Sequence, residues 1–141
     1  IGGGGLIAGV GSAIKAKAPL VQVLGAEPEV AAPLAESLKA NAPVKFDMWE
    51  HSFIDGAGGK SVIPRMWERM RPVIDGDIVV TLDQDRRAMK LMAEKARVIA
   101  EGAGALPLAA ALTGQAGDGP IACIVSGGNV DLKRFAELID I

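Results

Sequence analysis

Four consecutive glycines, Gly2–Gly5, run directly into an apolar helical pattern that begins at Leu6. Because glycine has no Cβ, such a turn lets several backbone N–H groups approach one anion. The first turn of the following helix adds unpaired N–H groups and the positive end of the helix dipole. The run therefore predicts a phosphate-binding turn. Turns of this kind usually follow a strand, so we expect Ile1 to end a strand whose neighbours lie outside this chain.

Composition narrows the class of protein. A length of 141 residues suits one domain, and half of the residues are hydrophobic while only 4% are aromatic. The net charge of −2, without a basic stripe, argues against a nucleic-acid partner. No apolar run is long enough for a membrane span. The single cysteine fits a reducing, cytoplasmic compartment. The single histidine argues against a histidine-based metal site.

Periodicity predicts strands alternating with helices, which indicates an α/β fold with a mostly parallel sheet flanked by helices. We expect strands over 20–26, 77–82 and 121–125, with a short one at 44–46. Helices are expected over 6–18, 30–40, 62–70, from Asp83 or Asp85 as cap to 98, from about 106 to 112, and 131–138. In the long helix, Met89, Met92, Ala96 and Ile99 should face inward, and Pro107 should lie in the first turn of the next helix.

A second motif, Ser126-Gly127-Gly128-Asn129, follows the last expected strand. Ligands of open α/β sheets bind at the carboxyl ends of strands, so the Ser126 hydroxyl is a candidate ligand contact. The alternative is a simple strand-to-helix turn with Asn129 or Asp131 as the helix cap. The glycine run also allows a dinucleotide-type spacing with Glu27 after the next strand, which keeps a non-catalytic, Rossmann-like nucleotide-binding module open.

Taken together, these motifs resemble the fold type II pyridoxal-phosphate enzymes, in particular the threonine/serine dehydratase and serine racemase group. The resemblance rests on Gly2–Leu6, Ala26–Pro28, Ile54–Gly56, Glu101–Ala105 and Ser126–Asp131, in the family's order. It implies that residues 1–141 form a single partial domain, the C-terminal part of the large cofactor-binding domain. The N-terminal part of the same enzyme is then the expected partner.

The resemblance also implies roles for individual residues. Gly2, Gly3, Gly4, Gly5 and the Leu6 amide would bind the phosphate of pyridoxal 5'-phosphate, and Ser126 would hydrogen-bond its pyridine nitrogen. Gly56 would lie near the cofactor ring through its backbone, and Glu101 would sit beside the ring or the substrate. The alternative for Glu101, a carboxylate stabilised by a helix N-terminus, stays open. Asp55 is interpreted as a turn former and His51 as a surface residue.

Two positions depart from the family's pattern. The Schiff-base lysine lies in a Ser-Phe-Lys context that is absent here, so this chain is expected to contain no catalytic residue and to be inactive alone. Metal-binding relatives use a Glu, a backbone carbonyl and an Asp. Glu27 and the Ala31 carbonyl match the first two, but Pro33 replaces the Asp, so no metal site is expected.

The activity implied by the resemblance is that of a pyridoxal-phosphate-dependent ammonia-lyase. It would convert a β-hydroxy amino acid of the serine or threonine type to a 2-oxo acid and ammonia. An amino-acid racemase on the same scaffold is the alternative within the family. The resemblance further implies an amino-acid substrate and a homo-oligomer, either a dimer or a tetramer.

Overall fold

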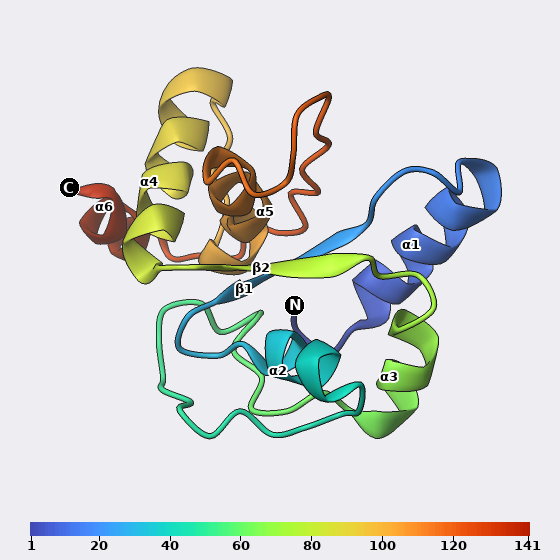
Figure 1. The fold of residues 1–141 in the computed structure, drawn as a ribbon. Coiled ribbons are helices and arrows are strands. Elements are labelled where there is room, and N and C mark those ends of the chain that lie inside the picture. Colours follow the sequence, from blue (N-terminus) through green and yellow to red (C-terminus); the bar gives the residue numbers. More distant parts are fainter.

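The computed structural model describes residues 1–141 and confirms the α/β class, with helices arranged around a parallel sheet (Figure 1). The elements in chain order are α1 (Gly5–Lys17), β1 (Leu24–Pro28), α2 (Pro33–Ala40), α3 (Pro64–Met70), β2 (Gly76–Val80), α4 (Leu82–Leu91), the π-helical turn η1 (Met92–Ala96), α5 (Gly102–Leu112) and α6 (Leu132–Ile139). None of these helices has the length and apolar character that a membrane crossing requires.

The sheet consists of β1 and β2, which pair in parallel from Leu24↔Gly76 to Pro28↔Val80. Figure 1 shows α4 and α5 above the strands and α2 below them, so helices cover both faces. The first strand begins at Leu24 and not at Leu20, where we expected it. The reason is a turn after α1, in which the Val21 N–H donates to the Ala18 carbonyl and Leu20 is left almost fully exposed.

Two apolar clusters hold the layers together. The larger cluster lies between the sheet and α4, α5 and α6, and its most deeply buried side chains include Met89 and Leu106. The smaller cluster joins α2 and α3 around Leu34 and also contains Trp67 and Met70. The predicted inward positions Met89 and Met92 are therefore confirmed. Ala96 and Ile99 are exposed instead, because the helix passes into η1 and ends at Arg97, which has a left-handed φ of 59°.

The starts of two later helices differ from expectation. Thr81, and neither Asp83 nor Asp85, caps α4: its hydroxyl accepts the Gln84 N–H and the Gln84 side chain accepts the Thr81 N–H. Helix α5 already begins at Gly102, so Pro107 lies inside it and not in its first turn. The sequence did contain the signal for this cap, because Thr81 followed three residues later by Gln84 is the capping-box pattern.

The expected strand over 121–125 is also corrected. This segment forms no backbone hydrogen bond with any other part of the chain, and so it is not paired as a strand. Its only hydrogen bond joins the half-buried Cys123 thiol to the Pro107 carbonyl, at 3.5 Å. A strand requires a neighbouring strand, and within residues 1–141 none lies beside this segment. The shorter strand expected at 44–46 is reduced to one antiparallel bridge between Lys45 and Ser61.

Asp85 is fully buried on α4, and neither of its carboxyl oxygens has a hydrogen-bond partner. Burial raises the pKa of Asp85 to about 8, from an ordinary value of 3.8. The folded state therefore holds a proton that the unfolded chain releases between about pH 4 and pH 8. The contribution of Asp85 to stability is present at low pH and is lost as the pH rises through 8.

We accordingly expect Asp85→Asn to make the full-length protein more stable at pH 9 by roughly 1–3 kcal/mol, with a smaller gain at pH 5. Chemical denaturation of variant and parent at both pH values measures this difference. Asp83→Asn is the matched control, because that side chain on the same helix is 68% exposed. A gain that is equal at the two pH values would contradict an ionising, unpaired Asp85.

Candidate functional site

The glycine run forms a sharp turn into α1. Gly4 is the helix cap and adopts a left-handed φ of 85°, a conformation that favours glycine. A Cβ on Gly4 would collide with the Met70 sulfur, and one on Gly2 would collide with the Gly56 carbonyl oxygen. Two of the four glycines are thus required by the packing of the chain itself. The contact also brings Gly56 to the glycine turn, as expected for a shared site.

Gly3 and Gly5 behave differently, because a Cβ on either would meet nothing within 4 Å. The amides of Gly3, Gly5 and Leu6 find no acceptor within the chain, and all three residues are exposed. Lys15 and Lys17 lie in the last turn of α1, so no positive side chain of this helix stands at its first turn. The exposed amides and the helix dipole make this turn suitable for an anion.

Glu101 lies between Gly56, a predicted site residue, and Gly127, the residue that follows Ser126. Its backbone N–H donates to the Gly127 carbonyl at 3.2 Å, and its own carbonyl accepts the Gly104 and Ala105 amides at the start of α5. The Glu101 carboxylate occupies the space that a Cβ on Gly127 would need, and it lies 4.0 Å from the position of a Cβ on Gly56. The structure therefore brings Gly56, Glu101 and Gly127 together. The last contact was missed at the sequence level, although the two glycines after Ser126 were its signal.

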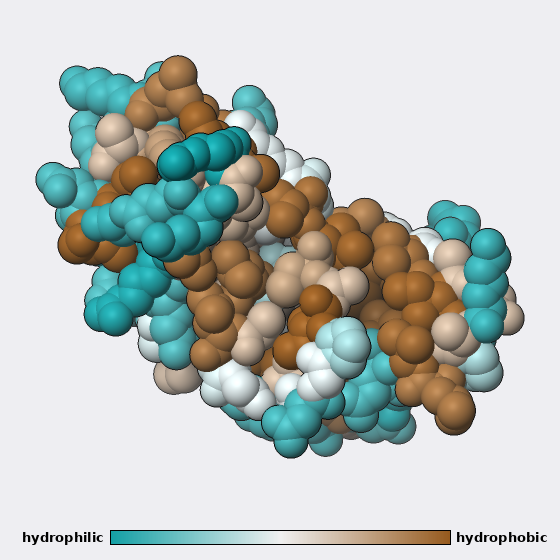
Figure 2. Space-filling model, turned by 90° about the horizontal axis from the view of Figure 1, so that it is seen from above, coloured by the Kyte–Doolittle hydropathy of each residue, from teal (hydrophilic) through white to brown (hydrophobic).

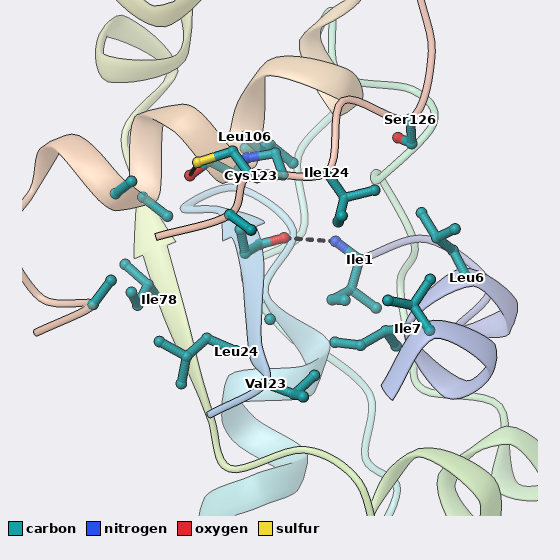
Figure 3. A pocket seen from close by; sticks show the side chains of 18 of the residues that line it. Ile1, Leu6, Ile7, Val23, Leu24, Ile78, Leu106, Cys123, Ile124 and Ser126 are labelled. Carbon is teal, nitrogen blue, oxygen red and sulfur yellow. Dashed lines mark hydrogen bonds between the residues drawn. The ribbon is translucent and has the colours of Figure 1, made fainter. Parts of the chain in front are cut away.

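Ser126 is exposed, and its hydroxyl forms no hydrogen bond within the chain. The cap of α6 is Asp131, whose carboxylate accepts the Arg134 N–H at 2.9 Å. The prediction that Asp131 caps this helix is thus confirmed. The Ser126 hydroxyl is not used by this cap and stays available for a ligand. Figure 3 shows Ser126 across the hollow from Leu6 and Ile1.

These residues border one hollow of about 830 Å³. Gly2–Leu6, Gly56 and Ser126 form its polar part, and Leu24, Leu106 and Ile124 belong to its apolar part. Seen from above, apolar side chains border the hollowed middle of the molecule (Figure 2). The volume lies within the range of cofactor sites, and free amides at one side with a free hydroxyl at another match a phosphate and a ring nitrogen. The residues present fit pyridoxal phosphate.

No lysine lines this hollow. Lys15, which belongs to α1, is instead held by Asp75 at 2.6 Å and by the Val21 carbonyl at 2.9 Å. His51 and Asp55 face a second hollow of about 460 Å³, which also contacts Glu101. His51, Asp55 and Glu101 thus share this second hollow, and none of the three lines the larger one.

Both carboxyl oxygens of Glu27 accept hydrogen bonds from the start of α2. Glu27 is fully buried at the end of β1, and its two carboxyl oxygens accept the Leu34 and Ala35 amides at 3.0 Å each. Burial, reinforced by the nearby Asp77 carboxyl, raises the pKa of Glu27. Glu27 thus closes the N-terminus of α2, which begins at Pro33. No three His, Cys, Asp or Glu side chains are grouped as metal ligands.

Comparison with known proteins agrees with this geometry. Residues 1–127 match the family described as pyridoxal-phosphate dependent enzyme. The chain is 37% identical over 149 residues to a catabolic L-threonine dehydratase of Staphylococcus aureus, covering 99% of this chain and 42% of that protein. The crystal structure of a threonine deaminase from T.th. superposes with a TM-score of 0.88 at 35% identity, covering 94% of this chain and 45% of that one.

Maize serine racemase superposes similarly, with a TM-score of 0.86 at 35% identity, over 97% of this chain and 45% of its own. The chain thus spans less than half the length of the relatives that it matches. The residues that match the family, 1–127, include the glycine turn, Gly56, Glu101 and Ser126. The chain belongs to the family of pyridoxal-phosphate-dependent enzymes.

Proposed function

We propose that the full-length protein is a pyridoxal-phosphate-dependent ammonia-lyase that acts on a β-hydroxy amino acid of the serine or threonine type. The products are a 2-oxo acid and ammonia. The observation that carries this proposal is the free, exposed Ser126 hydroxyl facing the same hollow as the unpaired amides of the glycine turn. The similarity to threonine dehydratase over nearly the whole chain supports it.

Within this proposal, the chain's own residues bind and orient. The amides of Gly3, Gly5 and Leu6 hold the phosphate at the N-terminus of α1, while Gly2 and Gly4 shape the turn. Gly56 leaves room beside the ring, and Glu101 places a carboxylate between Gly56 and Gly127. The chemistry that pyridoxal phosphate supplies when bound is withdrawal of electrons from the substrate.

Ser126 sets the strength of that withdrawal. A neutral hydroxyl donates to a pyridine nitrogen without forcing it to carry a proton, whereas a carboxylate stabilises the protonated ring. A weaker electron sink favours rapid loss of the β-hydroxyl over prolonged exposure of Cα to a second proton. This difference favours elimination over racemisation in the proposed enzyme.

The second candidate is an amino-acid racemase, favoured by the 35% identity to maize serine racemase. No observation favours the nucleotide-binding module, and the family match favours a pyridoxal-phosphate enzyme instead. We further propose that the remaining part of the enzyme supplies the Schiff-base lysine, and that the complete protein is a cytoplasmic homo-oligomer. Incubating the full-length protein with L-serine and L-threonine, and assaying both the 2-oxo acids and the D-amino acids, separates lyase from racemase.

Ser126 offers the most direct test. In the full-length protein, Ser126→Ala should keep bound pyridoxal phosphate but lower turnover roughly five-fold, because one hydrogen bond of about 1 kcal/mol is lost. Ser126→Asp should change the absorption spectrum of the bound cofactor and shift products from 2-oxo acid towards D-amino acid. Spectra and product assays of both variants measure this. If both variants behave like the parent, Ser126 does not touch the ring.

A further inference from the structure

The backbone that carries Ser126 is anchored by the residue that follows it. None of the backbone N–H or C=O groups of residues 121–125 is hydrogen-bonded to another backbone group of the chain. The Gly127 carbonyl, in contrast, accepts the Glu101 N–H at 3.2 Å, directly before α5. The direction of the Ser126 hydroxyl therefore depends on how Gly127 packs against the start of α5.

Gly127 lies directly against the first turn of α5. A Cβ on Gly104 would collide with the Gly127 carbonyl oxygen, and it would lie 3.3 Å from the Gly127 nitrogen. A Cβ on the next residue, Gly128, would collide with the Ile99 carbonyl oxygen. These obstacles are backbone atoms, which cannot rotate aside as the end of a side chain can. The close approach of the two segments thus requires that Gly104 has no side chain.

The first turn of α5 is also fixed from its other side. A Cβ on Gly102 would lie 2.9 Å from the side chains of Phe53 and Ile54. Successive residues turn by about 100° around a helix axis, so Gly102 and Gly104 face nearly opposite directions. The helix itself packs in the larger apolar cluster. A side chain at Gly104 would therefore displace the exposed segment at Ser126, and not α5.

We propose that Gly104 is a positioning residue for Ser126. The missing side chain of Gly104 lets the Gly127 carbonyl lie against α5, and this contact fixes the direction in which the Ser126 hydroxyl faces the hollow. The inference rests on the proposed function, in which that hydroxyl donates to the ring nitrogen of pyridoxal phosphate. Hydrogen bonds span only about 2.5–3.2 Å, so a displacement of roughly 1 Å breaks one. A methyl group added at Gly104 then has the same consequence as removal of the Ser126 hydroxyl.

The first test uses the full-length protein with bound pyridoxal phosphate. Gly104→Ala should lower turnover roughly five-fold, as expected for Ser126→Ala, and change the absorption spectrum of the cofactor in the same direction. The cofactor should be retained, because the glycine turn that holds its phosphate is unchanged. Turnover and a spectrum equal to those of the parent would overturn the proposal.

A double-mutant cycle distinguishes positioning from a general structural effect. In the Ser126→Ala background, Gly104→Ala should change turnover less than about two-fold, because the hydroxyl that it displaces is already absent. Gly102→Ala is the matched control: it adds the same methyl group to the opposite face of the same turn, and its effect should be equal in both backgrounds. Effects of Gly104→Ala and Ser126→Ala that multiply to roughly 25-fold would overturn the proposal.

Gly128→Ala provides the same test if Gly104→Ala does not fold. Gly128 is exposed and has no left-handed φ, so the substitution strains no buried part of the chain. Its Cβ would meet the Ile99 carbonyl and displace the same segment. The loss of turnover should again fall below about two-fold in the Ser126→Ala background. An undiminished loss in that background would overturn the proposal.

Assaying 2-oxo acids and D-amino acids in the same samples separates this inference from the proposed function. A parent that forms no 2-oxo acid, with equal cofactor spectra of Gly104→Ala and Ser126→Ala that differ from its own, would uphold the positioning and reject the lyase. Formation of 2-oxo acid, together with multiplying effects of the two substitutions, would reject the positioning and leave the proposed function standing.

Discussion

Replacing Gly3 with valine is expected to weaken retention of pyridoxal phosphate by the full-length protein roughly 10- to 100-fold, without changing the stability of the cofactor-free form. A Cβ on Gly3 would meet no atom within 4 Å, and Gly3 has no left-handed φ, so a side chain there strains nothing in the chain. We expect it instead to hinder the approach of a phosphate to the turn that carries the unpaired Gly3, Gly5 and Leu6 amides. The loss of one charge-assisted hydrogen bond, worth about 1.5–3 kcal/mol, sets the expected size.

Equilibrium dialysis of the cofactor, with thermal unfolding of the cofactor-free protein, measures both quantities. Gly9→Val is the control, because Gly9 is also exposed and unhindered but lies more than one turn into α1. Retention by Gly3→Val equal to that of Gly9→Val would show that the turn does not hold the phosphate.

Gly4→Val should have the opposite signature, a loss of folding stability of roughly 2–5 kcal/mol that appears even without cofactor. The left-handed φ of 85° at Gly4 costs a residue with a Cβ about 1–2 kcal/mol, and collision with the Met70 side chain adds about 1–3 kcal/mol. Because Gly4 is also the cap of α1, the start of this helix should loosen.

A double-mutant cycle with Met70→Ala separates the two causes. Chemical denaturation should show that Met70→Ala removes the collision but not the backbone strain, so the substitution at Gly4 costs less in the Met70→Ala background yet still costs stability. A Gly4→Val protein as stable as the parent would mean that Gly4 does not adopt this conformation. Gly3 and Gly4 are adjacent, so opposite outcomes would assign one glycine to the ligand and the other to the fold.

Local chemistry made much of this protein predictable from its sequence. The four glycines without a Cβ predicted the glycine turn, and the apolar periodicity that follows them predicted α1. This helix begins one residue before the expected start. Asp131 was one of two expected caps for α6, because the side chain of a cap residue accepts the backbone N–H two or three residues later. In the structure this donor is the Arg134 N–H. The motif at Ser126 and the family followed from residue types in order, and the family was confirmed. The roles of the individual site residues stay predictions.

Other features depend on which segments meet in three dimensions. Nothing in the four glycines distinguishes Gly4, which packs on Met70, from Gly3, which packs on nothing. Periodicity predicted a strand over 121–125, but a strand exists only where a second one pairs with it. The sequence by itself determined the glycine turn and the helix that follows it, since both depend on residues that are near neighbours in the chain. The tertiary structure alone decided the partners of Glu27 and Glu101, because those contacts join residues that are distant in sequence or belong to different elements.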